Sequence, residues 1–371
     1  MNNKLLITFI FGTRPEAIKL APLIRLFRDN KSFSTRIVTT GQHKELLMDV
    51  LEVFEIDPDN NLNLMVEKQS LSNLNIAILR GLDEEFDQFL PNLIIVQGDT
   101  TTAYAASMAA FYRKIKIAHV EAGLRTGNLY SPFPEEANRR LIGQITDLHF
   151  APTKRAEKNL LNSNVSGKVY VTGNTVIDAL FYIANKCNSK LSFMNNWRET
   201  KFILVTVHRR ENWGKNIENI CDALKIISEK YPDINFVIPM HPNKIVRNTL
   251  IPKLGNLEKF HLIEPLKYSS LIEALKNCFF ILTDSGGIQE EAPSLGKPVL
   301  VLRNNTERVE GIENGTAKLV GTEINTISNG ISELITNSSL YQAMSEAVNP
   351  YGDGKASKRI LKICMEELFH V

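Results

Sequence analysis

Short apolar runs alternate with longer amphipathic stretches along all 371 residues, and this pattern limits the fold more than any other feature. Alternation of this kind builds βαβ units with a parallel sheet. The first half has candidate strands at Leu5–Phe11, Ser34–Thr39, Leu93–Gln97, Ile115–Val120 and Leu148–Ala151. The pattern then restarts, at Phe202–Val207, Asn235–Pro239, Phe260–Ile263, Phe279–Thr283 and Pro298–Leu302. The sequence therefore predicts an α/β protein with two Rossmann-like domains facing across a cleft.

A polar stretch around Asn185–Lys201 separates the two halves of this pattern. We expect an N-terminal Rossmann-like domain over 1–185 and a second one over 186–355. After Gly352-Asp353-Gly354, apolar residues at helical spacing predict a last helix from about Ala356 to Leu368. We expect this C-terminal segment, 356–371, to pack back on the N-terminal domain.

Composition excludes several classes of protein. The formal net charge of +2 offers no whole-chain argument for binding nucleic acid or an acidic membrane surface. The four cysteines, Cys187, Cys221, Cys278 and Cys364, have neither metal-ligand nor redox spacing, which fits a reducing compartment. The first apolar run is too short for a signal peptide, and no run has the length of a membrane helix. The expected location is the cytoplasm.

Three acidic residues come just after apolar runs in the first half: Asp99 in QGDT, Glu121 in HVEAG and Glu135 in FPEEANR. The carboxyl ends of parallel strands form the edge of a sheet where ligands bind. Carboxylates gathered there repel one another and lose water, so we expect some raised pKa values, as proton transfer requires. Each of them alone has a structural interpretation, such as a helix cap or, for Glu135, a pair with Arg139. Three at successive strand ends favour an enzyme that moves protons.

Two loops have features of phosphate sites at helix starts. Gly12-Thr13-Arg14-Pro15-Glu16 combines a capping-box spacing with Arg14 at a helix amino terminus, and Lys19 follows one turn later. Thr283-Asp284-Ser285-Gly286-Gly287 places two glycines and a hydroxyl where backbone amides approach a phosphate closely. Glu291, further along that helix, is placed to accept hydrogen bonds from a ribose diol. A plain helix start for the first loop and a plain tight turn for the second are the alternative interpretations.

His208, Arg209 and Arg210 follow the strand Phe202–Val207, where they suit a departing pyrophosphate. A structural histidine and a surface Arg210–Glu211 pair are the alternative. His241 and His43 occupy comparable places with weaker support. Neither half carries the Gly-x-Gly-x-x-Gly fingerprint after its first strand, which argues against an NAD enzyme.

Together these motifs resemble the bacterial, non-hydrolysing UDP-N-acetylglucosamine 2-epimerases, which have the GT-B fold. The resemblance runs through Gly12–Lys19, Gly41–His43, Gly98–Thr102, His119–Thr126, Pro134–Arg139, Gly173–Asp178, His208–Glu211, Asp284–Pro298 and Thr306–Arg308. It implies reversible inversion at C2, giving UDP-N-acetylmannosamine for cell-surface polysaccharide, with no metal and no cofactor. UDP is eliminated to leave 2-acetamidoglucal and then added back. The family needs carboxyl groups for the proton and cations for the departing UDP.

Carried over by position, Asp99, Glu121 and Glu135 resemble the acid/base set, and His208 the group that stabilises leaving UDP. The nucleotide- and substrate-binding positions are Arg14, Lys19, Ser285, Gly286, Gly287, Glu291 and Arg308. Relatives also hold a second UDP-N-acetylglucosamine as an activator. The positions that resemble this second site are Gln42, His43, Gln69, Glu136, Arg209 and His241. The resemblance further suggests a homodimer.

Other functions stay open at this point. A sister epimerase of a modified UDP-sugar, such as a UDP-2,3-diacetamido uronic acid, would carry nearly the same motifs. A hydrolysing 2-epimerase fits Gly12–Glu16 less well. A GT-B glycosyltransferase would share the UDP site and need an acceptor. A non-catalytic UDP-sugar sensor would not need three carboxylates.

Overall fold

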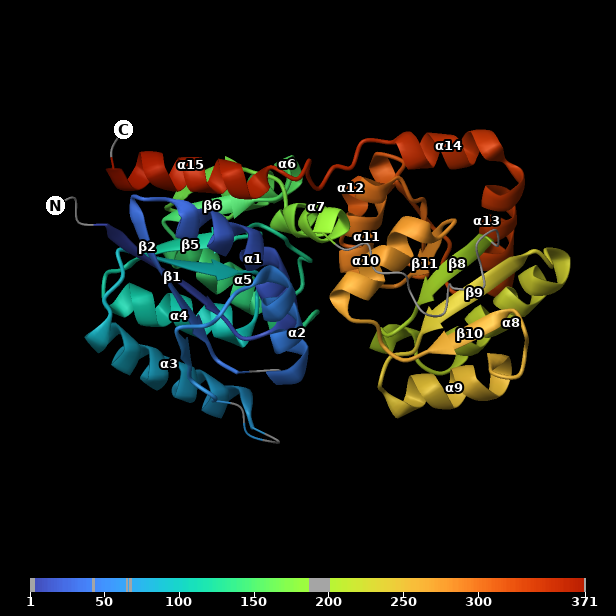
Figure 1. Cartoon of the computed structure of the whole chain (residues 1–371), viewed down its shortest axis with the longest axis horizontal. Coiled ribbons are helices and arrows are strands. Elements are labelled where there is room, and N and C mark those ends of the chain that lie inside the picture. The colour runs from blue at the N-terminus through green and yellow to red at the C-terminus, as the bar shows by residue number, and fades with distance from the viewer. Residues whose placement is uncertain (1–3, 42–43, 65, 67–68, 187–200, 370–371) are drawn as a thin grey trace. The chain divides into compact units, whose positions relative to one another are not determined.

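The structure is a computed structural model that describes residues 4–41, 44–64, 66, 69–186 and 201–369. The chain forms two compact units (Figure 1). Unit 1 contains Met1–Tyr182 and Tyr351–Val371, and unit 2 contains Ile183–Pro350. The chain thus leaves unit 1 once and returns to it for its last helix.

Unit 1 is built on a seven-stranded sheet with the order β3-β2-β1-β4-β5-β6-β7. All paired strands are parallel. Their bounds are β1 Leu5–Phe11, β2 Phe33–Thr39, β3 Asn60–Asn61, β4 Leu93–Gln97, β5 Lys116–Val120, β6 Leu148–Ala151 and β7 Lys168–Val171. The order reverses between β1 and β4, so the carboxyl ends of β1, β4 and β5 flank the switch point where ligands bind in such folds.

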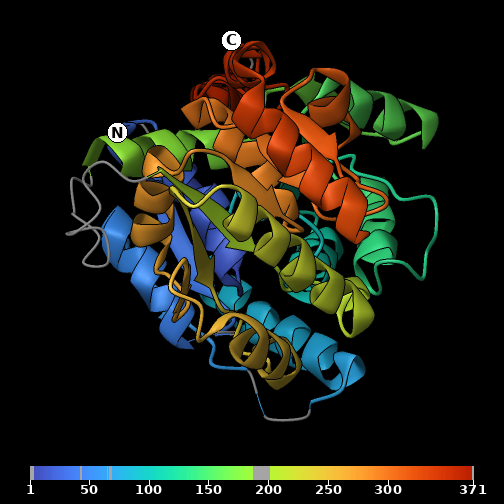
Figure 2. The ribbon, with the colours of Figure 1, turned by 90° about the vertical axis from the view of Figure 1, so that its right-hand side faces the viewer.

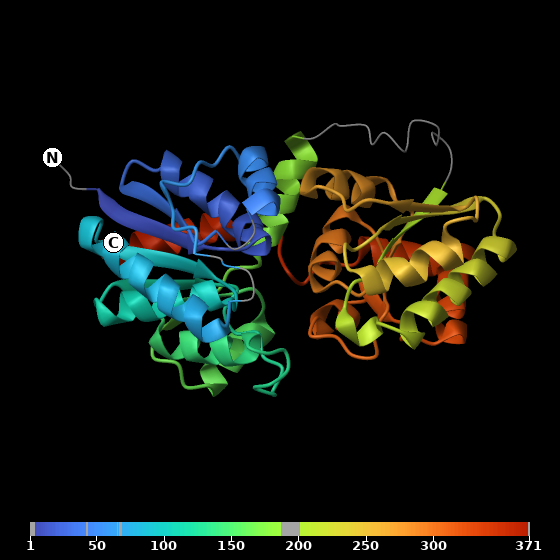
Figure 3. The ribbon, with the colours of Figure 1, turned by 90° about the horizontal axis from the view of Figure 1, so that it is seen from below.

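Helices cover both faces of this sheet, which explains why its central strands are apolar throughout. The helices are α1 Arg14–Asp29, α2 Lys44–Phe54, α3 Leu71–Gln88, α4 Thr101–Tyr112, α5 Glu135–Ile145, α6 Lys154–Asn162, α7 Thr175–Lys186 and α15 Ala356–Phe369. On one face α3, α4 and α5 pack in a row over strand residues such as Ile94 and Val96. Figure 3 shows α3 and α4 side by side.

The C-terminal helix α15 packs against α1 in unit 1. At its far end the Phe369 ring lies 5.7 Å from the Phe33 ring, centroid to centroid. Glu367 accepts hydrogen bonds from Lys168 Nζ at 2.6 Å and from Tyr170 Oη at 2.6 Å. The helix is therefore held to β2 and β7 as well as to α1.

Unit 2 has a six-stranded sheet with the order β10-β9-β8-β11-β12-β13, again parallel throughout. The strands are β8 Lys201–Thr206, β9 Ile234–Pro239, β10 Phe260–Ile263, β11 Ile281–Thr283, β12 Val299–Val301 and β13 Ala317–Leu319. Its order reverses between β8 and β11. The residues after these two strands therefore lie at the switch point of unit 2.

The helical elements of unit 2 are η2 Arg210–Asn212, α8 Lys215–Lys230, α9 Lys244–Leu254, α10 Tyr268–Asn277, α11 Gly286–Glu291, η3 Ala292–Leu295, α12 Val309–Glu313, α13 Ile324–Thr336 and α14 Ser338–Glu346. On one face α9, α8 and α13 lie side by side (Figure 2). They pack over alternate strand residues such as Ile203, Val205 and Phe236, which are almost fully buried.

All ten predicted strands exist, and four of them, Leu5–Phe11, Leu93–Gln97, Leu148–Ala151 and Phe260–Ile263, have the predicted bounds. The sequence analysis missed β3, β7 and β13. These are the short outer strands of the two sheets, and none of them has a long apolar run. Most of the polar stretch that was expected to separate the domains lies outside the described residues.

Candidate active site

The loop after β1 is held by the buried carboxylate of Glu16. It accepts hydrogen bonds from the backbone N–H of Thr13 at 2.8 Å, the Thr13 hydroxyl at 2.7 Å and the Thr100 hydroxyl at 2.7 Å. The predicted capping box is present. Burial raises the pKa of Glu16, although these hydrogen bonds act against the rise. Glu16 therefore ties the loop that carries Arg14 to the start of α4.

Glu121 directly follows β5 and lies almost buried at the switch point of unit 1. Its two oxygens are 2.7 and 2.6 Å from Lys19 Nζ. Gln97 and Asn174 also donate to it, Asn174 from 3.0 Å. Its φ is +63°, a left-handed value that a residue with a Cβ adopts only where its surroundings impose it. The local backbone is thus strained so that this carboxylate meets three donors.

Asp99 follows β4 and is oriented by α5. Arg139 Nε lies 2.8 Å from Asp99 Oδ2, and Asn138 Nδ2 donates to the Asp99 carbonyl at 2.9 Å. The Asp99 side chain is 30% exposed, whereas Arg139 is 9% exposed. The carboxylate is therefore anchored on one side and open to a ligand on the other.

Glu135 is the first residue of α5 and is half-buried. Across the described ranges of the chain, its carboxylate has no hydrogen bond or ion pair. Its neighbour Glu136 differs completely, because it is fully buried and bound by Arg139 at 3.2 Å and Arg140 at 3.0 Å. Of the two adjacent glutamates, Glu135 is the one presented to a ligand.

Asp99, Glu121 and Glu135 lie on neighbouring elements at one edge of unit 1, and we call this set the carboxylate rim. β4 and β5 are paired neighbours, and Asn138 of α5 bonds to Asp99. Two of the three negative charges that were expected to crowd at this edge are paired with cations in the structure. Lys19 and Arg139 neutralise Glu121 and Asp99 instead of leaving the carboxylates to repel one another. Lys19, predicted to bind nucleotide, thus also contacts the candidate acid/base set.

In unit 2, His208 follows β8 and is held by Asp284, which follows the neighbouring strand β11. His208 Nδ1 lies 3.1 Å from Asp284 Oδ1. Asp284 also accepts from the backbone N–H of His208 at 3.0 Å and of Arg209 at 2.9 Å, and from Asn212 Nδ2 at 2.9 Å. Although its complete burial acts the other way, these bonds and the His208 ring hold the pKa of Asp284 below its usual value. With Nδ1 facing Asp284 and the side chain 39% exposed, Nε2 is the nitrogen that faces a ligand.

The pairing of Asp284 with His208 was not predicted from the sequence, because Thr283–Gly287 was interpreted only as a phosphate-binding loop. The available signal was an acidic residue at the end of an apolar strand whose parallel neighbour ends in a histidine. We call His208, Arg209, Asp284, Ser285 and Arg308 the histidine rim.

The other cations near this edge are held by carboxylates of the same unit. Arg308 Nε lies 2.8 Å from Glu290, and the guanidinium carbon is 3.1 Å from where a Cβ on Gly286 would stand. Arg209 pairs with Glu307 at 3.4 Å. Burial opposes ionisation of Glu307, but Arg303, Arg209 and Arg308 lower its pKa to about 2. A larger residue at 286 would require the Arg308 guanidinium beside the start of α11 to shift by a few tenths of an ångström.

The remaining predicted positions are less closely grouped. Glu291 is 5% exposed and accepts a hydrogen bond from the Tyr268 hydroxyl at 2.6 Å. The His241 ring lies 5.9 Å from the His208 ring, and burial lowers the pKa of His241. Gln69 accepts from the Val66 N–H at 3.4 Å. Gln42 and His43 lie outside the described residues.

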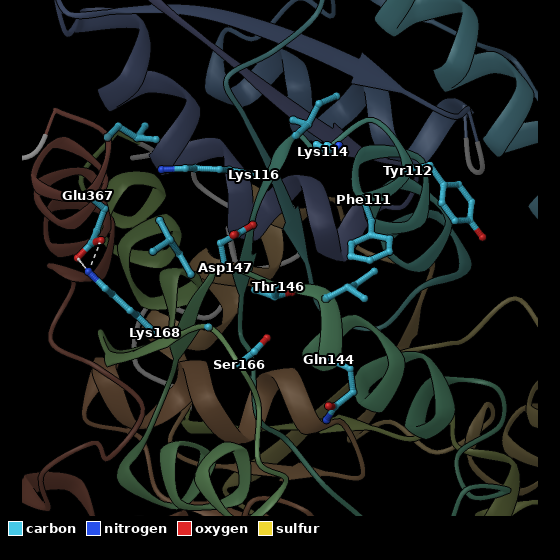
Figure 4. A pocket seen from close by; sticks show the side chains of 15 residues that line it. Phe111, Tyr112, Lys114, Lys116, Gln144, Thr146, Asp147, Ser166, Lys168 and Glu367 are labelled. Atoms are coloured by element: carbon cyan, nitrogen blue, oxygen red, sulfur yellow. Dashed lines mark hydrogen bonds and ion pairs between the residues drawn. The ribbon is translucent and has the colours of Figure 1, made fainter.

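A hollow of about 800 Å³ lies elsewhere in unit 1, near the amino ends of β5, β6 and β7 (Figure 4). Two of its lining residues, Lys168 and Glu367, bind one another at 2.6 Å. Asp147 in its wall accepts from the Ile117 N–H at 2.8 Å. The hollow is at the opposite end of the strands from the carboxylate rim, so we do not assign it to the reaction.

The described residues contain no group of three or more His, Cys, Asp or Glu side chains placed to hold a metal ion. No helix in these ranges has the length and apolar character needed to cross a membrane. Cys221, Cys278 and Cys364 are buried free thiols.

The chain is similar over nearly its whole length to several UDP-N-acetylglucosamine 2-epimerases. A putative UDP-N-acetylglucosamine 2-epimerase of Clostridium acetobutylicum is 49% identical over 357 residues, covering 95% of this chain and 92% of the relative. The crystal structure of the Neisseria meningitidis UDP-GlcNAc 2-epimerase bound to UDP-GlcNAc matches with a TM-score of 0.92 and 45% identity, over 98% of this chain and 100% of the other. The S. aureus MnaA–UDP co-structure matches with a TM-score of 0.91 and 48% identity, over 99% and 98%.

These matches confirm the predicted GT-B-like class of two parallel-sheet α/β domains. The family model described as UDP-N-acetylglucosamine 2-epimerase matches residues 25–365. The resemblance inferred from the motifs is therefore correct, and the chain belongs to the UDP-N-acetylglucosamine 2-epimerase family of enzymes.

Proposed function

We propose that this chain interconverts UDP-N-acetylglucosamine and UDP-N-acetylmannosamine by the non-hydrolysing route. The observation that supports the proposal is the carboxylate rim, where Glu121 is bound by Lys19, Asp99 is bound by Arg139, and Glu135 at the start of α5 has neither partner. Groups that take up and return a proton need such distinct environments. The names of the relatives, and the UDP-GlcNAc bound in the Neisseria meningitidis structure, support the same substrate.

The reaction has to overcome the low acidity of the C2 proton, because C2 does not adjoin a carbonyl. We propose that a rim carboxylate removes this proton while the C1–O bond breaks and UDP departs with the bonding electrons. The product of this step is 2-acetamidoglucal. UDP then adds back to C1 and a proton is delivered to the opposite face of C2, so no net proton or water is consumed. Asp99, Glu121 and Glu135 share the two proton transfers.

The histidine rim is suited to the other half of this chemistry. A His208 ring anchored through Nδ1 by buried Asp284 has Nε2 available for the phosphate oxygen that becomes negative as UDP leaves. Ser285, Gly286, Gly287 and Arg308 are proposed to bind the diphosphate, and Glu291 the ribose. Arg14 and Lys19 are also proposed as substrate-binding residues. No bound metal or cofactor is part of this proposal.

Further parts of the proposal come from the family resemblance and, for the location, from the composition. They are a second UDP-N-acetylglucosamine acting as an activator at Gln42, His43, Gln69, Glu136, Arg209 and His241, a homodimer, a cytoplasmic location, and a supply of N-acetylmannosamine units to a cell-surface polysaccharide. A sigmoidal dependence of rate on UDP-N-acetylglucosamine would support the activator. A hyperbolic dependence, with no activation of the reverse reaction, would remove it.

The deciding experiment is proton NMR of the purified protein with UDP-N-acetylglucosamine in heavy water. We expect UDP-N-acetylmannosamine with deuterium at C2. Free N-acetylmannosamine with UDP would instead indicate a hydrolysing enzyme. No turnover with UDP still bound would indicate a modified sugar substrate or a glycosyltransferase, and would refute the proposed activity.

A further inference from the structure

The motif Gly173–Asp178 has no part in the reaction proposed above, yet it contacts one of the reacting groups. Asn174 lies between β7 and α7 and is 2% exposed. Its Nδ2 donates to Glu121 Oε1 at 3.0 Å, while its Oδ1 accepts from the Val176 N–H at 3.2 Å. Since the Val176 N–H requires an acceptor, the amide can face Glu121 only with its donor. The side chain of Asn174 therefore has a single consistent orientation.

The three donors to Glu121 divide its two oxygens between them. Lys19 Nζ lies within hydrogen-bond distance of both oxygens, Gln97 donates to Oε2, and Asn174 donates to Oε1. An ammonium is a point charge without directional preference, so it does not fix the plane of a carboxylate. The side-chain amides of Gln97 and Asn174 each donate to a different oxygen, and together they fix the plane of the carboxylate. Asn174 is the one that does not come from the strand next to Glu121.

The backbone of Asn174 is held in turn by the segment on which the chain returns to unit 1. The Asn174 N–H donates to the Tyr351 carbonyl at 2.7 Å. Gly352, with a φ of +150°, adjoins the same residue: a Cβ there would stand 3.4 Å from the Asn174 nitrogen, in van der Waals contact. At the other end of the motif, Asp178 accepts from the Ser357 N–H at 2.8 Å. The motif is thus fastened to the returning chain at both ends.

We propose that Asn174 is a positioning residue that fixes the plane of the Glu121 carboxylate for proton transfer, with the return segment fixing Asn174. This inference rests on the catalytic role proposed for Glu121. It also gives a role to the contact that Tyr351–Gly352 makes with Asn174. Misplacing a reacting group by about 1 Å costs on the order of a hundredfold in rate.

The test uses Asn174→Asp and Asn174→Ala in the full chain. Aspartate keeps the size of the side chain and the acceptor for the Val176 N–H, but it replaces the donor to Glu121 with a negative charge. We expect kcat to fall about tenfold to a hundredfold in both variants, with KM for UDP-N-acetylglucosamine little changed. The thermal unfolding midpoint of Asn174→Asp should fall, because a second carboxylate is then buried beside Glu121, and kcat is measured at a temperature where both variants are folded.

Asp178→Asn is the matched control. It alters the same motif and its bond to the start of α15, but it does not touch Glu121. We expect a lower unfolding midpoint and a kcat close to wild type. An equal loss of kcat in Asp178→Asn and Asn174→Asp would show a general effect of the motif and would overturn the positioning role.

The combination of Asn174→Ala with Glu121→Gln separates the two proposals. If Asn174 acts through Glu121, the double variant is no slower than Glu121→Gln alone, because residues that act as a unit are non-additive. Losses that multiply, or a wild-type kcat in Asn174→Asp, would overturn the role of Asn174 and leave that of Glu121 intact. A wild-type rate in Glu121→Gln alone would overturn both.

Discussion

The two switch points of this molecule use the same elements with opposite charges. At the carboxylate rim of unit 1, carboxylates face the ligand and buried cations such as Arg139 support them from behind. At the histidine rim of unit 2, the half-exposed His208 faces the ligand and the buried carboxylate of Asp284 supports it. In the Asp99–Arg139 and His208–Asp284 pairs the supporting group is the more buried member, whereas Glu121 is more buried than Lys19, 5% exposed against 13%. A Rossmann-like switch point can therefore present either carboxylates or a basic side chain.

The largest expected effect comes from removing the presented charge of unit 1. Asp99→Asn, Glu121→Gln and Glu135→Gln should each reduce turnover by about a hundredfold to ten-thousandfold, the range typical of a positioned acid or base. Because none of the three carboxylates is among the proposed UDP-binding residues, UDP affinity measured by calorimetry should stay largely intact. A position that keeps near wild-type turnover has no part in the proton transfers.

The next effect tests the supporting charge of unit 2. Asp284→Asn removes the anion that orients His208, and the buried N–H donors of His208 and Arg209 then compete for a neutral amide oxygen. We expect kcat to fall about tenfold to a hundredfold, by an analogy with the outer partners of histidine ligands. The double variant with His208→Ala should be no slower than His208→Ala itself. A slower double variant would show that Asp284 acts other than through the ring.

The third expected effect is a difference in stability between removing Arg139, which supports Asp99, and removing its more exposed neighbour Arg140. Arg139→Ala leaves buried Glu136 and Asp99 without their shared partner, and we expect a loss of about 3 kcal/mol or more in the free energy of unfolding. Arg140→Ala removes a 42% exposed partner of the same Glu136 and should cost under about 1 kcal/mol. Chemical denaturation of both variants gives the comparison, and equal losses would contradict it.

The smallest effect is a difference between the units in their response to acid. Burial lowers the pKa of His119 to about 4 and of His149 to about 3. An unfolded chain therefore binds more protons than the folded one below about pH 6.5, so stability is full above that pH and falls as pH drops toward 4. The His119 shift corresponds to about 3 kcal/mol at most. Glu307 of unit 2, with its pKa lowered to about 2, loses its contribution only below about pH 4.5.

Thermal unfolding of wild type and His149→Leu between pH 7.5 and pH 4 checks this difference, at about ten values of pH. The variant should lose less stability than the wild type as the pH falls. Identical slopes would show that the two buried histidines do not cause the acid sensitivity.

Much of the fold was readable from the chain because parallel strands covered on both faces have to be apolar throughout. The runs at Leu5–Phe11 and Leu93–Gln97 therefore became strands with the predicted bounds. Asn60–Asn61 became strand β3 only because it pairs with β2 at the sheet edge. No local preference of two asparagines predicts that pairing.

The sequence by itself determined the two α/β halves, the apolar cores and the acidic and basic residues at the strand ends, because burial and turn chemistry act on neighbouring residues. Only the tertiary structure decided which of these residues support one another. Lys19 and Glu121 are 102 positions apart, His208 and Asp284 are 76, and Asn174 meets Glu121 across 53. Such pairs form because separate strands end at the same edge of a sheet, and no local pattern in the chain records which ends will meet.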